Sequence, residues 1–253
     1  MSIDWNKHQA AIWRSRKEYL RPVQNIDPIS LDDLLGVERQ KHLLLANTER
    51  FVNKQKANNA LLWGARGTGK SSLIKAMFNQ FYKQGLRLVE VDKDDLIFLP
   101  EIVDEIRDIE HRFIIYCDDL SFEANETHYK SLKSVLEGSI ELPPDNVLIY
   151  ASSNRRHLVP ESMQDNRDSG LVEGELHYAD AIEEKISLSD RFGLWLSFYP
   201  PGQEQYLEMV DHYFKGFKGS RDELHAEALR FSQSKGGARS GRTAKQFFQF
   251  YVE

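Results

Sequence analysis

The sequence predicts an α/β fold in which helices sandwich a parallel β-sheet, followed by a small helical domain. Short apolar runs rich in Ile, Val and Leu recur along the first 200 residues. They are separated by segments with helical periodicity or many turn-forming residues, a pattern typical of buried parallel strands. A glycine-rich segment joins one of these runs to a helix, and only helical patterns remain beyond Pro200. The length of 253 residues allows one large domain with an appendage.

The N-terminal region, residues 1–26, is predicted to be an amphipathic helical extension. Its apolar residues recur at spacings near three and four, namely Trp5, Ile12, Trp13, Tyr19 and Leu20. A turn is expected at Pro28, after which Ser30 or Asp32 is expected to cap a helix that runs beyond Gly36.

The region of residues 27–200 is predicted to be the α/β domain. Its expected strands are Ala60–Trp63, Leu86–Val91, Phe113–Cys117, Val147–Ala151 and Leu194–Phe198. The first strand precedes a helix over Ser71–Lys83. The acidic, aperiodic stretch Met163–Glu184 is predicted to be a mobile loop. A boundary near Pro200 introduces the lid, residues 201–253, with helices expected over Gln205–Tyr213, Asp222–Gln233 and Arg242–Tyr251.

Composition excludes several classes of protein. The formal net charge of -6 gives no overall attraction to nucleic acid or to an anionic membrane, although it leaves open a local basic groove. The single cysteine, Cys117, forbids an intrachain disulfide and fits a reducing cytoplasm. It lies in an apolar run and is expected to be packed in the core. No apolar stretch is long enough to predict a membrane-spanning segment.

The glycine-rich segment matches the phosphate-binding pattern G-x-x-x-x-G-K-[ST] at every specified position. It comprises Gly64, Ala65, Arg66, Gly67, Thr68, Gly69, Lys70 and Ser71, and we include the next residue, Ser72, in the site. In this pattern, glycines let backbone N–H groups converge on phosphate oxygens at a helix N-terminus. Lys70 is therefore expected to contact the β- and γ-phosphates of ATP, and Ser71 to bind Mg²⁺.

Two carboxylates follow the apolar run Phe113–Cys117. We expect this strand to lie beside the strand that leads into the phosphate loop. Asp118 is the predicted Mg²⁺ ligand, since an acid at the end of such a strand can hold the ion that Ser71 touches. Asp119 is the predicted residue that activates water, with Glu123 as the substitute.

With these motifs in order, the chain resembles the AAA+ ATPases, ring-forming P-loop proteins with an α/β nucleotide domain and a helical lid. The resemblance implies that the segment Asp32–Glu38, including Leu35 and Gly36, lines the adenine pocket. It also implies that Asn154, after the strand Val147–Ala151, senses the γ-phosphate and aligns water. AAA+ proteins usually carry Glu where this chain has Asp119, which is one methylene shorter.

Two further arginine motifs carry the same resemblance. Arg191, in SLSDRFG, matches the arginine finger that reaches the γ-phosphate of a neighbouring subunit, and so implies a homo-oligomeric ring. Arg239, in GGARSGR, matches the lid arginine that contacts the subunit's own nucleotide, with Arg242 as the second choice. The sequence further resembles a bacterial AAA+ subgroup known only as a domain of unknown function, which implies a fold but no substrate.

The leading functional hypothesis is Mg²⁺-dependent hydrolysis of ATP, coupled to the movement of an unidentified partner. Two alternatives stay open: an ATP-binding switch with negligible turnover, and a kinase built on the same phosphate loop. A GTPase is disfavoured because no N-K-x-D motif follows the loop. For the partner, a DNA-associated loader and a protein remodeller are comparable hypotheses, and no membrane partner is expected.

Overall fold

Seven strands form one sheet in the computed structural model, which describes residues 3–122, 129–138, 140–156, 158 and 188–252. The strand order is β2-β1-β4-β5-β6-β3-β7, and every neighbouring pair is parallel except β1 and β2. The strands are β1 (Ala10–Arg14), β2 (Tyr19–Pro22), β3 (Ala60–Gly64), β4 (Leu86–Val91), β5 (Arg112–Cys117), β6 (Val147–Ser153) and β7 (Leu194–Phe198). All five strands predicted from apolar runs are confirmed, and they form the centre of the sheet and its β7 edge.

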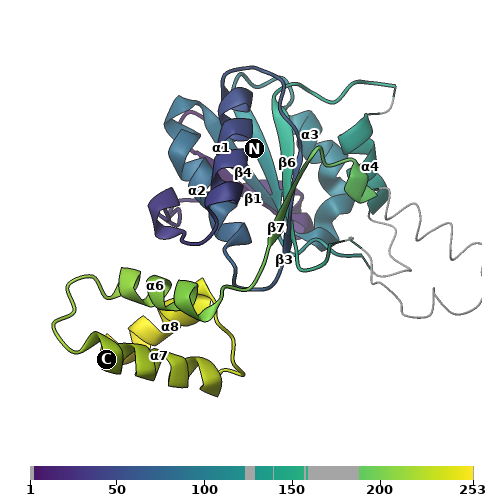
Figure 1. Cartoon of the computed structure of the whole chain (residues 1–253). Coiled ribbons are helices and arrows are strands. Elements are labelled where there is room, and N and C mark those ends of the chain that lie inside the picture. The colour runs from purple at the N-terminus through teal and green to yellow at the C-terminus, as the bar shows by residue number, and fades with distance from the viewer. Residues whose placement is uncertain (1–2, 123–128, 139, 157, 159–187, 253) are drawn as a thin grey trace, which may run out of the picture.

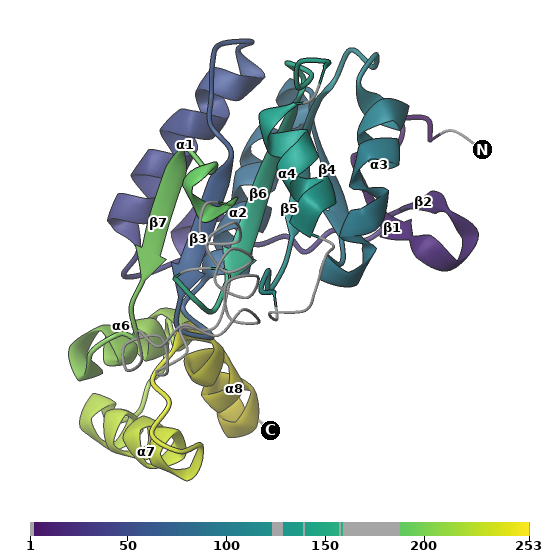
Figure 2. The same ribbon diagram turned by 90° about the vertical axis from the view of Figure 1, so that its right-hand side faces the viewer.

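Helices cover both faces of this sheet (Figures 1 and 2). One face packs against α1 (Glu38–Val52) and α2 (Lys70–Phe81), through buried side chains such as Leu44 and Met77. The other face packs against α3 (Leu99–Ile106) and α4 (Tyr129–Glu137). Short 3-10 helices are Ser15–Lys17, Leu31–Asp33, Tyr82–Gln84 and Lys93–Phe98. The buried thiol of Cys117 lies in the α3/α4 layer, as expected.

The predicted helical extension over residues 1–26 is wrong, because residues 10–22 form β1 and β2. Strand β1 pairs in parallel with β4 and extends the sheet by two strands. The side chains of Trp13 and Leu20 are buried in the core between the sheet and helices α3 and α4. With only five residues, β1 is too short for its spacing of apolar residues to distinguish a strand from a helix. The non-local pairing with β4 therefore decides the conformation.

The helix predicted to start at Ser30 or Asp32 begins later, at Glu38. Ser30 and Asp33 instead close a single 3-10 turn, in which Ser30 N donates to Asp33 Oδ2 at 2.8 Å. Gly36 then adopts φ +75°, a left-handed conformation that interrupts helical continuation. The turn leaves Leu34 and Leu35 in an irregular segment that lies at the functional cavity described below.

The strand that carries Asp118 does not lie beside the phosphate-loop strand, contrary to expectation. Strand β6 lies between β3 and β5, with Leu62 opposite Ser152 and Cys117 opposite Ala151. Residues that follow the carboxyl ends of all three strands therefore meet at one edge of the sheet. Because β6 is central, its last residues can reach both the loop and the carboxylates.

Three helices after β7 enclose a core of their own, separate from the sheet layers: α6 (Gln203–Tyr213), α7 (Arg221–Ser234) and α8 (Gly241–Val252). The predicted helices in this region are confirmed. Their core is aromatic, with Tyr206, Phe214 and Phe247 buried. Figure 2 shows this layer beneath the end of β3 that leads into the phosphate loop. None of the helices in the described ranges is both long and apolar enough to cross a membrane.

Candidate functional site

The phosphate loop turns from β3 into α2 with its lysine folded back onto the loop. Gly64, Gly67 and Gly69 have φ of +134°, +77° and +97°, values that favour glycine. Lys70 Nζ donates to the carbonyls of Gly64 at 2.7 Å and Ala65 at 2.8 Å. Burial lowers the pKa of Lys70, and the nearby charges of Asp118 and Asp119 oppose that effect. The N-terminus of α2 thus presents the loop that the sequence motif predicts.

Asn154 connects Lys70 to Asp119. Lys70 Nζ donates to Asn154 Oδ1 at 3.1 Å, and Asn154 Nδ2 donates to Asp119 Oδ1 at 2.5 Å. The three residues come from α2, the end of β6 and the end of β5. Asp119 itself has φ +49°, which an Asp adopts rarely and which turns the chain sharply after Asp118. The predicted γ-phosphate sensor and the predicted water-activating acid are therefore in direct contact.

Ser71 and Asp118 form the second polar pair of the site. Ser71 Oγ donates to Asp118 Oδ1 at 2.9 Å, although the residues lie 47 positions apart. Burial raises the pKa of Asp118, but hydrogen bonds from Ser152 and Ser71 outweigh it, so the net pKa is lowered. The carboxylate is thus ionised at neutral pH. A hydroxyl and an ionised carboxylate are hard oxygen ligands of the kind that Mg²⁺ prefers.

An orphaned buried group lies next to this pair. The Tyr116 hydroxyl is buried on β5 beside Asp118 and Ser71, and it makes no hydrogen bond of standard geometry within the described ranges. Burial, followed by the charge of Asp118, raises its pKa, so it stays a neutral donor. A neutral donor beside a carboxylate and a hydroxyl can hydrogen-bond the waters of a hydrated ion, and Mg²⁺ usually keeps several waters. The residues present therefore fit Mg²⁺.

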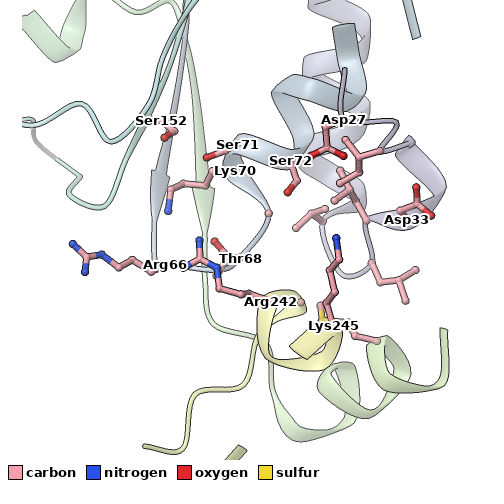
Figure 3. Close-up of a pocket in the computed structure, with 18 of the residues that line it drawn as sticks. Asp27, Asp33, Arg66, Thr68, Lys70, Ser71, Ser72, Ser152, Arg242 and Lys245 are labelled. Carbon is pink, nitrogen blue, oxygen red and sulfur yellow. The ribbon is translucent and has the colours of Figure 1, made fainter. Parts of the chain in front are cut away.

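A cavity of about 830 Å³ joins these residues to the lid. Figure 3 shows the phosphate loop on one wall and α8 on the opposite wall. The predicted residues that line it are Leu35, Arg66, Gly67, Thr68, Gly69, Lys70, Ser71, Ser72, Asp118, Asp119 and Asn154. Gly64, Ala65 and Gly36 do not line it; the first two accept the hydrogen bonds from Lys70. The predicted substitute Glu123 and the loop Met163–Glu184 lie outside the described residues.

The lid contributes Arg242 to the cavity and not Arg239. Arg242 lies at the first turn of α8, where its Cβ would be 3.6 Å from a Cβ built on Gly67. Arg239 is exposed and its guanidinium donates to Gln203 Oε1 at 3.4 Å. Of the two candidates, Arg242 therefore lines the cavity and Arg239 does not. Figure 3 also shows Lys245, one turn further along α8, extending into the cavity.

Arg191 lies away from the cavity, on the α4 side of the sheet. Its Nε donates to Glu137 Oε1, at the C-terminal end of α4. The side chain is 18% exposed. Arg191 is therefore not part of the cavity of its own chain.

Within the segment Asp32–Glu38 that was expected to line the adenine pocket, Asp33, Leu34 and Val37 line the cavity together with Leu35. Sequence reasoning missed other lining residues, namely Asp27, Pro28 and Ile29 before α1, Ser152 at the end of β6, and Met209, His212, Tyr213, Gly241 and Lys245 in the C-terminal helices. His212 Nε2 lies 3.7 Å from Asp33 Oδ1, and this contact joins the lid to the sheet domain. Most of the missed residues belong to no sequence motif and share only their proximity in space.

Known structures share this architecture. The chain is similar to Thermotoga maritima RuvB, a Holliday junction branch migration motor, with 16% identity, a TM-score of 0.56, and 88% of this chain and 63% of that one covered. One point mutant of that protein matches with a TM-score of 0.57 at 16% identity, covering 88% of this chain and 65% of the mutant. A second point mutant matches with a TM-score of 0.52 at 13% identity, covering 90% of this chain and 73% of the mutant. The chain thus spans about two thirds of the length of the first two. The search of curated proteins found no match.

The fold is therefore that of an AAA+ P-loop protein, with a mostly parallel sheet between helices and C-terminal helices beside the nucleotide motif. The expected subgroup is also found. A family described as "Protein of unknown function (DUF815)" matches residues 6–253. The chain belongs to the DUF815 family.

Proposed function

We propose that the cavity binds Mg²⁺-ATP and hydrolyses it to ADP and phosphate. The observation that carries this proposal is the chain of contacts from Lys70 through Asn154 to Asp119. It brings a phosphate-binding cation, a γ-phosphate sensor and a base within reach of one another. A metal-binding pair, Ser71 and Asp118, lies at the same edge of the sheet.

The roles of the residues follow from their positions. Lys70 would exchange the carbonyls of Gly64 and Ala65 for the phosphate oxygens, which are stronger acceptors for an ammonium group. Ser71 and Asp118 would hold Mg²⁺, which supplies charge neutralisation at the phosphates. Asp119 would accept the proton of the attacking water while Asn154 orients it.

The other end of the cavity suits a purine base. Leu34, Leu35 and Val37 line the cavity together with Met209 and Tyr213 of the lid, and an apolar lining of this kind favours a flat aromatic ring. Arg242 and Lys245 add positive charge from α8. We therefore assign residues 27–200 to a nucleotide-binding domain and residues 201–253 to its lid. Closure of the lid over ATP would bring Arg242 to the phosphates.

We further propose that hydrolysis moves a macromolecular partner within a homo-oligomeric ring, in which Arg191 reaches the neighbouring subunit's site. The relation to a branch migration motor supports a motor-like use of the fold, and a DNA-associated loader and a protein remodeller are the two forms it could take. We place the protein in the cytoplasm, given its lone buried cysteine.

An ATP-binding switch is the second candidate, and one observation favours it. The Asp119 carboxylate is already bonded to Asn154, and its side chain is one methylene shorter than the usual Glu. If this bond persists when ATP is bound, the site holds nucleotide without turning it over.

Steady-state phosphate release separates the two functions. We expect the wild type to release phosphate in a Mg²⁺-dependent manner, and Asp119→Asn to lower kcat by at least 100-fold, since a positioned base contributes about 10²–10⁴-fold. Turnover that is equally slow in the wild type and in Asp119→Asn, with ATP binding intact, would favour the switch. Absence of both binding and turnover would contradict the whole proposal.

A further inference from the structure

Three donors meet on a single oxygen of Asp118. Its Oδ1 accepts hydrogen bonds from Ser71 Oγ at 2.9 Å, from the backbone N–H of Asp119 at 3.0 Å, and from Ser152 Oγ. A carboxylate oxygen has two lone pairs, so three donors compete for it. One of the three, Ser71, is the residue proposed to turn toward Mg²⁺. The other two can stay in place when it leaves.

Ser152 is built into the end of the central strand β6. It is 2% exposed, and it follows Ala151, the residue paired with Cys117. Its carbonyl accepts from Leu120 N at 2.7 Å, so its backbone fixes the chain just after the two carboxylates. Its buried hydroxyl therefore makes its hydrogen bonds within the protein and not to bulk solvent.

The same hydroxyl contacts both carboxylate residues. While Ser152 Oγ donates to Asp118 Oδ1, it also accepts from Asp119 N at 3.1 Å, so the single N–H of Asp119 is shared between Ser152 Oγ and Asp118 Oδ1. Asp119 has φ +49°, and this hydrogen bond holds the N–H of that unusual turn. One buried side chain from β6 therefore fixes the direction in which Asp118 points.

We infer that Ser152 is a positioning residue, which holds the Asp118 carboxylate in place as a Mg²⁺ ligand after Ser71 has turned to the ion. This inference rests on the proposed Mg²⁺-ATP site. Hydrogen bonds that orient a metal-binding carboxylate typically contribute 10–100-fold to metal affinity. Ser152 would act on Mg²⁺ binding and leave metal-free nucleotide binding unchanged, because it does not belong to the phosphate loop.

The neighbouring residue provides a matched control. Ser153 lies on the same strand and is fully buried, but its hydroxyl accepts from Arg155 N at 3.1 Å, a contact outside the carboxylate pair. Ser152→Ala and Ser153→Ala therefore remove the same atom from adjacent buried positions. Ser152→Thr keeps the hydroxyl, and Ser152→Cys keeps the branching of the side chain but replaces the hydroxyl by a larger group that is a much weaker donor.

The experiment follows binding of a fluorescent ATP analogue, first in EDTA and then during a Mg²⁺ titration. We expect Ser152→Ala to raise the half-saturating Mg²⁺ concentration about 10-fold or more, with affinity in EDTA changed less than about 2-fold. Ser152→Cys should shift it in the same direction, and this variant decides the matter if Ser152→Ala does not fold. Ser152→Thr and Ser153→Ala should titrate like the wild type.

A wild-type Mg²⁺ dependence in folded Ser152→Ala or Ser152→Cys would overturn the inference alone. An equal shift in Ser153→Ala would also overturn it, because the effect would then come from any loss of packing in β6. Absence of analogue binding by the wild type in both conditions would instead overturn the proposed function, and this inference with it.

Discussion

The Cα atom of Gly64 lies so close to the backbone of Phe198 that a Cβ built on Gly64 would be 1.9 Å from the Phe198 carbonyl oxygen. That same oxygen accepts a hydrogen bond from Ala65 N at 3.1 Å. Phe198 ends β7 and Gly64 ends β3. The first residue of the phosphate loop is therefore held against the last residue of β7, which precedes the connection to the lid. A movement of the lid connection would thus act directly on the start of the phosphate loop.

Replacement of Gly64 tests this contact. We expect Gly64→Ala to lower the free energy of unfolding by about 2 kcal/mol or more, because the added methyl overlaps backbone and φ is +134°. ATP binding should fall with it. The control is Gly202→Ala at the start of α6, where a Cβ would meet nothing within 4 Å; we expect a change below about 1 kcal/mol. Urea denaturation measures both, and equal effects would contradict the assigned contact.

Replacement of the two lid arginines, Arg242 and Arg239, should affect ATP affinity to different extents. Arg242→Ala should weaken ATP binding about 10-fold, because a hydrogen bond to a charged group is worth about 1.5–3 kcal/mol. Arg239→Ala should change the affinity less than 2-fold, since Arg239 is exposed and bonded to Gln203. Isothermal titration with ATP tests the pair. A larger loss in Arg239→Ala would restore the order that the sequence motif suggested.

Much of the site could be predicted from the sequence because its signals are local. The phosphate loop and the acids Asp118 and Asp119 depend on short spacings that any reader can find. The choice between Arg239 and Arg242 could not be made, because it depends on where α8 begins relative to Gly67. The strands β1 and β2 could not be predicted either, because β1 pairs with β4, where Ala10 lies opposite Leu88, 78 residues further along the chain, and β2 pairs only with β1.

Arg191 is expected to act between subunits. Arg191→Ala should lower kcat by at least 100-fold and leave ATP affinity unchanged, since an arginine supplied in trans stabilises only the transition state. Phosphate release per subunit should rise with protein concentration. A mixture of Arg191→Ala and Lys70→Ala should recover part of the activity, because mixed interfaces then pair an intact site with an intact arginine. No recovery, together with concentration-independent wild-type turnover, would refute a role in trans.

The hydrogen bonds that Asp33 accepts from Ser30 predict a pH dependence of stability. Hydrogen bonds from the backbone and side chain of Ser30, together with His212, lower the pKa of Asp33 below its usual 3.8. A depressed pKa in the folded state stabilises the fold above pH 3.8, and this stabilisation is lost as pH falls through the folded value. The stability difference between wild type and Asp33→Asn should therefore shrink as the pH falls below 3.8. A difference that grows on acidification would have the wrong sign.

Direct binding of Mg²⁺-ATP, measured by isothermal titration calorimetry, tests the central claim most simply. We expect one ATP per chain in the wild type and a loss of affinity of at least 10-fold in Lys70→Ala, because its ammonium group lies at the centre of the loop. Lys83→Ala, an exposed lysine after α2 and outside the cavity, should bind like the wild type. Wild-type protein that binds no ATP, or a folded Lys70→Ala that binds it equally well, would contradict the assignment of this cavity as a nucleotide site.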